Sequence, residues 1–332
     1  MTEFLAWKWT ESAYFGTGSA VDERYHKPWP ADAPKELIET SYFGFSIPEA
    51  GINAEIYHWV HPMYGVVSGG IFIFQGIRAN QLQARYANWL NYMPEPDDMT
   101  DCTYANGIRV RMVRPMQEWE ISFEDPAAQT RLELNLKAIM PPAFRPVGGH
   151  LTQALKTSGE LLLRGERYRI DGFFTRDRSW GDPRSEAKTD PAPAGWHVAV
   201  FSEDLAFHDF SFDSPELNPT IGKRYPGYDN GKNLLWGYVW KDGELRGVKR
   251  TRTLHEFGLH GVGPTTVDLE ITDERDEVHM LHGETKAALP YYFWPNLPAF
   301  FCLTEWSYRG LTGYGDVQVG VYEQFAIENW RD

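Results

Sequence analysis

The stretch from Tyr168 to Arg184 reads Tyr-Arg-Ile-Asp-Gly-Phe-Phe-Thr-Arg-Asp-Arg-Ser-Trp-Gly-Asp-Pro-Arg. Its first half alternates polar and apolar residues, which is the pattern of a half-buried β-strand. Its second half gathers arginine, aspartate, tryptophan and glycine, a mixture too charged for an ordinary core strand and too aromatic for an ordinary turn. This stretch supplies the first candidate for a working carboxylate, Asp177.

The same period-2 alternation dominates most of the chain on both sides of this stretch. The clearest hairpin joins 234–240 to 245–254 through a Lys-Asp-Gly-Glu turn. Residues 79–93 fit either a helix or an irregular strand. Strands at this spacing, with few convincing helices, indicate antiparallel barrels or sandwiches. We expect strands over 42–47, 53–59, 65–74, 108–113, 118–123, 131–139, 160–163, 168–174, 196–201, 206–212, 234–240, 245–254, 267–271, 277–283, 300–308 and 317–325.

Two glycines, Gly148 and Gly149, separate two successive groups of strands. They follow a break at Pro141–Pro142, and glycine and proline are the strongest local signals for the end of a regular element. We therefore expect two domains, 1–148 and 149–332.

Residues 165–172 (Gly-Glu-Arg-Tyr-Arg-Ile-Asp-Gly) and 176–184 (Arg-Asp-Arg-Ser-Trp-Gly-Asp-Pro-Arg) resemble the tandem-lipocalin superfamily. That group includes AttH-like proteins and carotenoid 1,2-hydratases, and lipocalin-type Diels–Alderases share its fold. Many relatives carry Asp-His-Ser/Asn-Trp-Gly at this point, and Arg178 stands at the histidine position. Residues 150–153 and 42–45 also look similar to the group.

The resemblance implies an all-β fold of two consecutive lipocalin-like antiparallel β-barrels or half-barrels. It also implies an apolar pocket, inside a barrel mouth or between the two domains. In the hydratases of this group, a carboxylate in such a pocket is thought to protonate a carbon–carbon double bond. Because Arg178 replaces the usual histidine, a histidine-dependent step is not part of this expectation.

Composition excludes several classes of protein. The formal net charge is −14 and no dense run of Lys and Arg occurs, which argues against a nucleic-acid partner. The two cysteines, Cys102 and Cys302, cannot form a disulfide framework and favour a cytoplasmic location. The sequence shows neither a signal-peptide pattern nor an apolar run long enough to span a membrane. Aromatic residues make up 15% of the chain, which suits either a β-core or an apolar ligand pocket.

Familiar cofactor and nucleophile motifs are also missing from the sequence. We find no phosphate-binding glycine loop, no dinucleotide fingerprint and no Gly-x-Ser-x-Gly elbow. These absences argue against a kinase, a dehydrogenase and a serine hydrolase, and we expect no cofactor. The expected partner is a small hydrophobic molecule, and the sequence leaves open whether the chain forms a homodimer.

Asp177 is the first candidate for catalysis. A carboxyl group in an apolar barrel has a raised pKa and can deliver a proton, while nearby aromatic faces, Trp180 first among them, stabilise a developing cation. The alternative is structural, because Arg176, Arg178 and Arg184 lie close in sequence and an arginine partner would make Asp177 a clamp. In a catalytic site, Arg178 would orient a polar end of the substrate.

Glu323 is the second catalytic candidate. In the strand expected over 317–325, Val319, Val321, Glu323 and Phe325 share one face, so the glutamate interrupts an apolar row.

Other candidates would line the pocket. Alternation in 300–308 places Trp306 and Tyr308 on one face and Glu305 on the other. His26 and Trp29, in a proline-rich segment near the N-terminus, would lie over a pocket mouth, although a surface position is the simpler interpretation for His26.

The histidines give no basis for a metal site. His58 and His61 are three residues apart, as are His279 and His282, and residues at that spacing on a strand face opposite sides. We therefore expect no metal.

The leading interpretation is a lyase, isomerase or cyclase, hydratase-like and independent of cofactors. It would act by acid catalysis on a small hydrophobic terpenoid-, polyketide- or steroid-like substrate. The alternative from another class is a non-catalytic carrier of a hydrophobic ligand. A third interpretation is a hydrolase or metal-dependent enzyme built from the scattered histidines.

Overall fold

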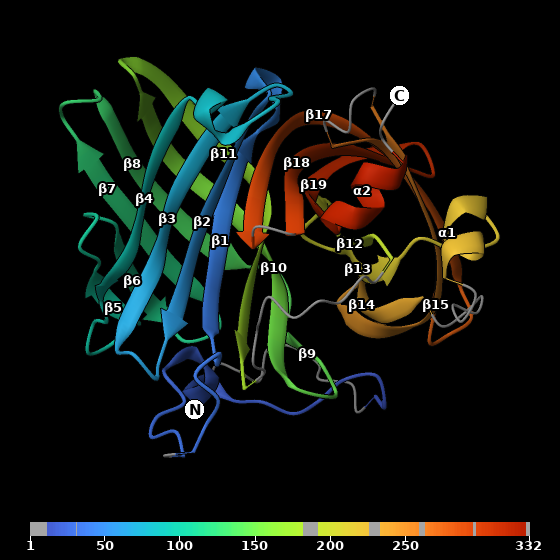
Figure 1. Ribbon diagram of the computed structural model, residues 1–332, viewed down its shortest axis with the longest axis horizontal. Helices are drawn as coiled ribbons and strands as arrows, with labels where there is room; N and C mark the ends of the chain where they lie inside the picture. Colours follow the sequence, from blue (N-terminus) through green and yellow to red (C-terminus); the bar gives the residue numbers. More distant parts are fainter. Residues whose placement is uncertain are drawn as a thin grey trace.

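The computed structural model describes residues 12–30, 32–181, 192–225, 233–258, 263–294 and 297–329. The strands form two bodies that stand side by side, an open curved sheet and a closed barrel (Figure 1). Neighbouring strands in both bodies pair antiparallel. This arrangement confirms the predicted all-β fold of two consecutive barrels or half-barrels: the first body is a half-barrel and the second is a closed barrel.

The open sheet has 11 strands. Their order is β4-β3-β2-β1-β11-β10-β8-β7-β6-β5, with β9 beside β10, so β1 pairs with a strand that follows it by more than 100 residues. The bounds are β1 (Glu39–Ile47), β2 (Ile52–His61), β3 (Val66–Gln75), β4 (Tyr86–Pro94), β5 (Asp101–Thr103), β6 (Arg109–Arg114), β7 (Glu118–Asp125), β8 (Thr130–Ala138), β9 (Ala143–Phe144), β10 (Gly149–Leu163) and β11 (Glu166–Trp180).

The closed barrel follows in the chain and is completed by pairing of its first strand with its last. A short helix, α1 (Pro219–Arg224), follows β13, and α2 (Glu323–Asn329) follows β19. The strands are β12 (Ala194–Ser202), β13 (Leu205–Phe212), β14 (Leu234–Lys241), β15 (Glu244–Phe257), β16 (Pro264–Asp273), β17 (Val278–Trp294), β18 (Leu297–Tyr308) and β19 (Leu311–Gly320). No helix in the described part of the chain has the length and apolar character needed to cross a membrane.

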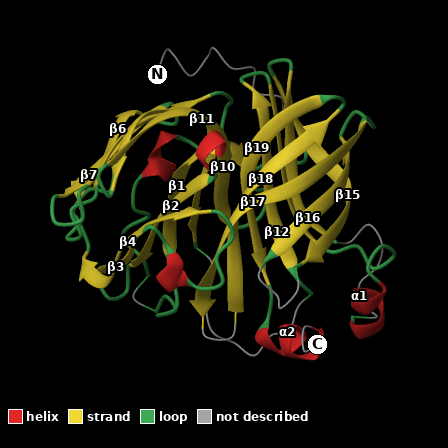
Figure 2. Ribbon diagram, turned by 90° about the horizontal axis from the view of Figure 1, so that it is seen from above, coloured by secondary structure: helices red, strands yellow, loops and turns green. Residues whose placement is uncertain are grey.

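Burial along the strands shows which parts of the sheet are covered on both faces. In β8 buried residues alternate with intermediate or exposed ones, as expected for a sheet with one face toward water. Every residue of β1 is buried. Phe43 and Phe45 pack in the core of the half-barrel, whereas Tyr42 packs on the other face in a cluster with Phe301 and Leu303 of β18. The half-barrel and the closed barrel therefore share an interface, and β1 lies within it (Figure 2).

The sheets divide the chain later than the expected boundary at 148/149. Strands β10 and β11, which follow Gly148, pair with β8 and β1 and belong to the open sheet. The change from the open sheet to the barrel falls between Trp180 and Ala194.

The structure decides one open alternative and corrects one prediction. The segment 79–93 is mainly a strand: a 3-10 turn at Gln81–Gln83 precedes β4. The last expected strand, 317–325, is wrong in its second half, because β19 ends at Gly320 and α2 begins at Glu323.

Candidate active site

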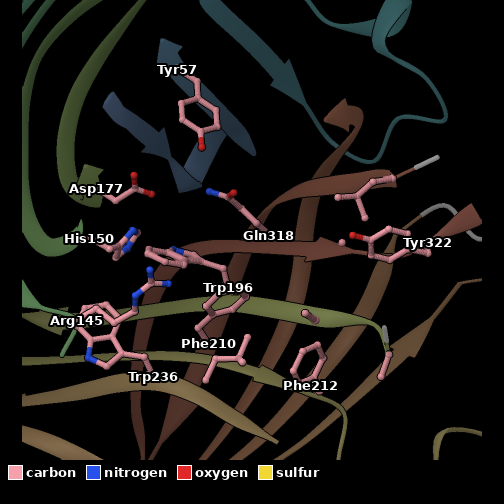
Figure 3. A pocket seen from close by; sticks show the side chains of 15 residues that line it. Tyr57, Arg145, His150, Asp177, Trp196, Phe210, Phe212, Trp236, Gln318 and Tyr322 are labelled. Atoms are coloured by element: carbon pink, nitrogen blue, oxygen red, sulfur yellow. The ribbon is translucent and has the colours of Figure 1, made fainter. Parts of the chain in front are cut away.

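A pocket of about 370 Å³ opens between the half-barrel and the closed barrel, a volume within the range of small-molecule sites. Asp177, His150 and Arg145 line one side of it, and Phe212 and Tyr322 lie toward the other (Figure 3). Aromatic side chains dominate the wall that the closed barrel contributes. The lining residues are Tyr57, Arg145, His150, Asp177, Ala192, Ala194, Trp196, Phe210, Phe212, Leu235, Trp236, Leu297, Gln318, Gly320 and Tyr322.

Asp177 reaches this pocket because of strand alternation. It pairs with Tyr42 of β1 and Thr152 of β10, so these side chains share the sheet face that meets the closed barrel. Arg176 and Arg178, one residue to either side, face the interior of the half-barrel. Asp177 is 8% exposed, although it lines the pocket.

The two flanking arginines pair with other carboxylates. Both terminal nitrogens of Arg176 reach Glu23, at 2.7 and 3.0 Å, and its guanidinium lies 4.0 Å from the ring centre of Trp119. Arg178 reaches Glu39 at 3.1 Å and donates to the carbonyl oxygen of Thr40. Both arginines therefore have carboxylate partners other than Asp177, and the structural alternative for Asp177 stays a prediction. Arg184, the third arginine of that alternative, lies outside the described residues.

His150 stands at the polar side of the pocket on β10. Its ring meets Trp196 and Trp236 edge-on, with centroid distances of 5.3 and 5.7 Å. Such edge-to-face contacts fix the two indole rings that form much of the closed-barrel wall.

A buried pair of carboxyl groups lies in the same interface, next to the pocket. Glu55 of β2 and Asp316 of β19 both lie within hydrogen-bond distance of the Tyr42 hydroxyl, with 2.7 Å separating that hydroxyl from Asp316 Oδ2. The side-chain amide of Gln318, a pocket residue, donates to the same Asp316 oxygen at 2.8 Å. Glu55 is 1% exposed and Asp316 is fully buried.

Burial raises the pKa of Asp316 to about 7. Burial, reinforced by the charge of Asp316, also raises the pKa of Glu55 well above its usual value. Counting the protons available for the contacts with Tyr42 also indicates that one of the two carboxyl groups is protonated. The phenol of Tyr42 has one proton, so it can donate to only one carboxyl, and the other contact requires a proton on the carboxyl itself. The pair therefore retains a proton near neutral pH.

Several predicted site residues lie away from this pocket. Trp180 stacks on His26 at 4.4 Å, at the half-barrel's junction with the N-terminal segment. His26 is held between Asp22 and Glu39. Trp29 lies half-buried in the same segment, and neither it nor Arg178 is among the lining residues.

The candidates on β18 and at the C-terminal end of the barrel also lie outside the pocket. Trp306 and Tyr308 are buried in the core of the closed barrel, and Glu305 faces outward, where it binds Tyr314 and Lys286. The alternation predicted for this strand is confirmed, but none of the three lines the pocket. Glu323 is exposed at the start of α2, so its predicted place in a buried strand row is wrong.

Sequence reasoning missed most of the residues that do line the site. Tyr57 and Gln318 are ordinary strand residues in the sequence, and the structure shows that they line the same pocket. Glu55 carried a usable signal, since it is a lone carboxylate in the strand predicted over 53–59. Trp196 and Trp236 offered no signal beyond their aromatic character.

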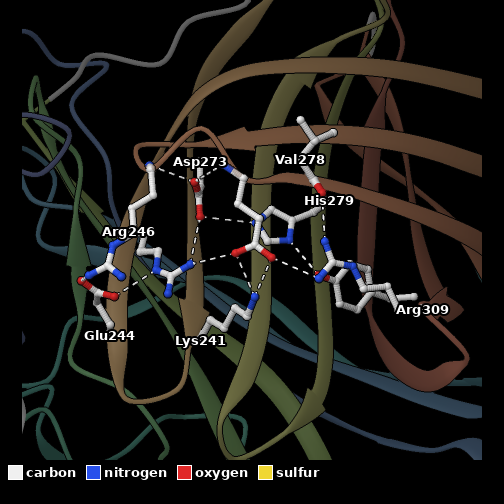
Figure 4. Close-up of polar contacts among 10 residues, drawn as sticks. Lys241, Glu244, Arg246, Asp273, Val278, His279 and Arg309 are labelled. Atoms are coloured by element: carbon white, nitrogen blue, oxygen red, sulfur yellow. Dashed lines mark hydrogen bonds and ion pairs between the residues drawn. The ribbon is translucent and has the colours of Figure 1, made fainter.

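One group of potential metal ligands occurs among the described residues, Asp273, Glu277 and His279. Lys241, Arg246 and Arg309 surround it (Figure 4), and Glu277 binds all three cations. The hydrogen bond from Lys241 is the main cause that lowers the pKa of Glu277, to about 2. The positive charge that a metal ion would supply is thus already present, and the arrangement is that of an ion-pair network.

Two solved structures share this architecture. Kievitone hydratase from Nectria haematococca matches with a TM-score of 0.52 and 13% sequence identity, over 86% of this chain and 88% of that one. An AttH protein from Nitrosomonas europaea, described as putative, matches with a TM-score of 0.50 and 12% identity, over 86% of this chain and 92% of that one. At these identities the likeness establishes the fold, which supports the predicted resemblance to AttH-like proteins and hydratases.

No curated protein sequence matches the chain. A family model, described as a domain of unknown function (DUF7064), matches residues 19–322, which is most of the chain. The protein therefore belongs to the DUF7064 family.

Proposed function

We propose that this protein is a hydratase-like enzyme that adds water to, or removes it from, a carbon–carbon double bond of a small hydrophobic molecule in the pocket between the two bodies. The observation that carries the proposal is the position of Asp177, a carboxylate at the wall of a largely aromatic pocket. The name of one structural neighbour, kievitone hydratase, agrees with this reaction class.

In the hydration direction, a carboxylic acid transfers its proton to one alkene carbon, forming a C–H bond and leaving a cation on the other carbon. Water then attacks that cation through oxygen, and the proton that the water loses returns to the carboxylate. The reaction consumes only the alkene and water, so it requires no organic cofactor. Asp177 is our candidate for the group that delivers and recovers the proton.

The surroundings of Asp177 suit both halves of this reaction. The faces of Trp196, Trp236 and Phe210 line the pocket and would stabilise a developing cation. The Glu55–Asp316 pair holds a proton near neutral pH, and Gln318 joins Asp316 to the pocket.

The test is to incubate the protein with kievitone and with other small hydrophobic molecules that carry a carbon–carbon double bond, and to search by mass spectrometry for products that have gained or lost one water. Asp177→Asn should abolish turnover and leave the circular-dichroism spectrum unchanged. Asp171→Asn is the matched control, because Asp171 lies on the same strand but binds Lys156 and Arg169 at the surface. It should keep full activity.

Two results would overturn the proposal. Full turnover by Asp177→Asn would remove the proposed acid from the mechanism. Tight binding of these compounds followed by release of unchanged molecules would instead favour the carrier interpretation.

A further inference from the structure

Four buried side chains form a continuous chain of contacts inside the closed barrel. Asp209 Oδ1 lies 3.1 Å from His197 Nδ1, and His197 Nε2 lies 2.8 Å from His255 Nε2. His255 Nδ1 in turn lies 2.5 Å from Asp213 Oδ1. His197 is on β12 and His255 on β15, which are not neighbours in the barrel, so the chain of contacts crosses its interior.

The two carboxylates are held by neutral groups. Ser211 donates to Asp209, and Asn218, the N-cap residue of α1, donates to Asp213 at 2.9 Å. Asp209 and Asp213 are fully buried, and His197 and His255 are 1% and 4% exposed. In the described part of the chain, Asp209 and Asp213 are the charged groups that face the two imidazoles, and neither carboxylate has a Lys or Arg partner.

The number of protons in this chain follows from its three contacts. A carboxylate oxygen and an unprotonated imidazole nitrogen can only accept hydrogen bonds. Each of these contacts is therefore a hydrogen bond only if one of its two atoms carries a proton. Three contacts at 2.5 to 3.1 Å therefore require three protons. Two neutral imidazoles supply only two. The chain must hold one proton more than two neutral histidines and two carboxylates provide.

A metal ion between the two Nε2 atoms is the competing explanation, since carboxylates commonly support metal-bound histidines through Nδ1. Two nitrogens on one tetrahedral Zn²⁺, at about 2.0–2.1 Å each, would stand about 3.3 Å apart. The observed separation is 2.8 Å, which is a hydrogen-bond distance. Moreover, no third ligand atom converges on them among the described residues.

We propose that Asp209, His197, His255 and Asp213 form a second acid–base site, in the interior of the closed barrel, whose ligand is a single proton shared between the two imidazoles. The inference does not depend on the proposed hydratase activity. With that proton the four side chains carry a net charge of −1, and without it two nitrogen acceptors would oppose each other in a buried site. The site thus binds a proton and links β12 to β15 across the barrel.

Gly195 brings this site next to the wall of the pocket. It lies on β12 between Ala194 and Trp196, which both line the pocket. A Cβ atom at Gly195 would lie 2.1 Å from His197 Nε2 and 2.7 Å from His255 Cε1. The absence of a side chain at Gly195 therefore allows the rings of His197 and His255 to come into contact. Strand β12 lies between the shared proton and the candidate active site.

The experiment is to count protonated ring nitrogens by nitrogen NMR of the full chain labelled with ¹⁵N-histidine, in neutral buffer. Signals are assigned with His197→Gln and His255→Gln. We expect the four ring nitrogens of the pair to hold three protons between them, one on each Nδ1 and one shared by the two Nε2 atoms. A count of two overturns the proposal, and so does a stoichiometric metal found by elemental analysis of the purified protein.

Gly195→Ala provides a second measurement. It should force the rings apart and lower the count by one proton per chain. Gly172→Ala is the control, because a Cβ at Gly172 meets nothing closer than 3.6 Å. It should leave the count unchanged. If Gly195→Ala does not fold, the count in the unmodified chain still decides the question.

Discussion

The buried ion pair between Arg176 and Glu23 permits a quantitative prediction about stability. Arg176 is fully buried, Glu23 is 4% exposed, and two hydrogen bonds join them. Removing one partner of a buried ion pair typically costs about 3–5 kcal/mol, because the other charge stays buried without compensation. We expect Glu23→Gln to lower the free energy of unfolding by about 3 kcal/mol, at the low end of that range. Glutamine keeps one acceptor oxygen, and Gln153 still accepts from Arg176 Nε at 2.9 Å.

The double variant Glu23→Gln/Arg176→Met separates the charge from the packing. It leaves no buried charge, so its loss of stability should be well below the sum of the two single losses. The assay is urea unfolding at equilibrium, followed by both circular dichroism and tryptophan fluorescence. Asp101→Asn is the control, because Asp101 and its partner Arg109 have side chains that are 56% and 47% exposed, and such a pair contributes at most about 1 kcal/mol.

Two outcomes would refute this reasoning. The first is that Glu23→Gln costs no more than Asp101→Asn, which would mean that water reaches the Arg176 guanidinium. The second is that the losses of the two single variants add in the double variant, which would mean that the two side chains do not interact energetically.

Two further predictions concern other buried groups. The pKa of folded Asp316, about 7, lies above its usual 3.8, so folding takes up a proton between these pH values and the free energy of unfolding falls as pH rises through that window. Asp316→Asn should remove this part of the slope in urea titrations at several pH values, and an unchanged slope would contradict the assignment. Cys102 and Cys302 are both buried, and burial raises the pKa of both thiols, that of Cys102 to about 11. A thiol reagent in mildly alkaline buffer should label neither in the folded protein and both in urea; rapid labelling of the folded protein would refute this.

The sequence predicted what depends on local periodicity. Alternation located most strands and the hairpin that joins 234–240 to 245–254. The opposite orientations of Asp177 and its two flanking arginines emerged only from the structure. Alternation could not reveal the partners of those side chains. Glu23 and Glu39 lie more than 130 residues from the arginines that they bind, and only the pairing of β1 with β11 brings these regions together.

Glu323 illustrates how the period-2 interpretation fails. Val321 and Phe325 are buried, as expected for alternate residues of a strand. Residues four apart also share one face of a helix, with the residue midway between them on the opposite face, although α2 itself begins only at Glu323. The same spacing therefore fits a buried acid in a strand or an exposed acid in a helix. No local feature of the sequence distinguished the strand from the helix. The pocket residues could not be predicted for a related reason, because their proximity depends on how the two bodies pack.

The pairing of the first and last strands in the closed barrel also bears on how the chain folds. The barrel closes when β12 pairs with β19, so it cannot close until residues up to Gly320 have been synthesised. In contrast, β1 can pair with β11 as soon as residues up to Trp180 have been synthesised. Contacts between residues so far apart in sequence form slowly. During synthesis, the half-barrel should mature first and offer a surface on which the later strands assemble. A ribosome stalled at Tyr308, before β19 is made, would then hold a finished half-barrel beside a ring that still lacks its closing strand.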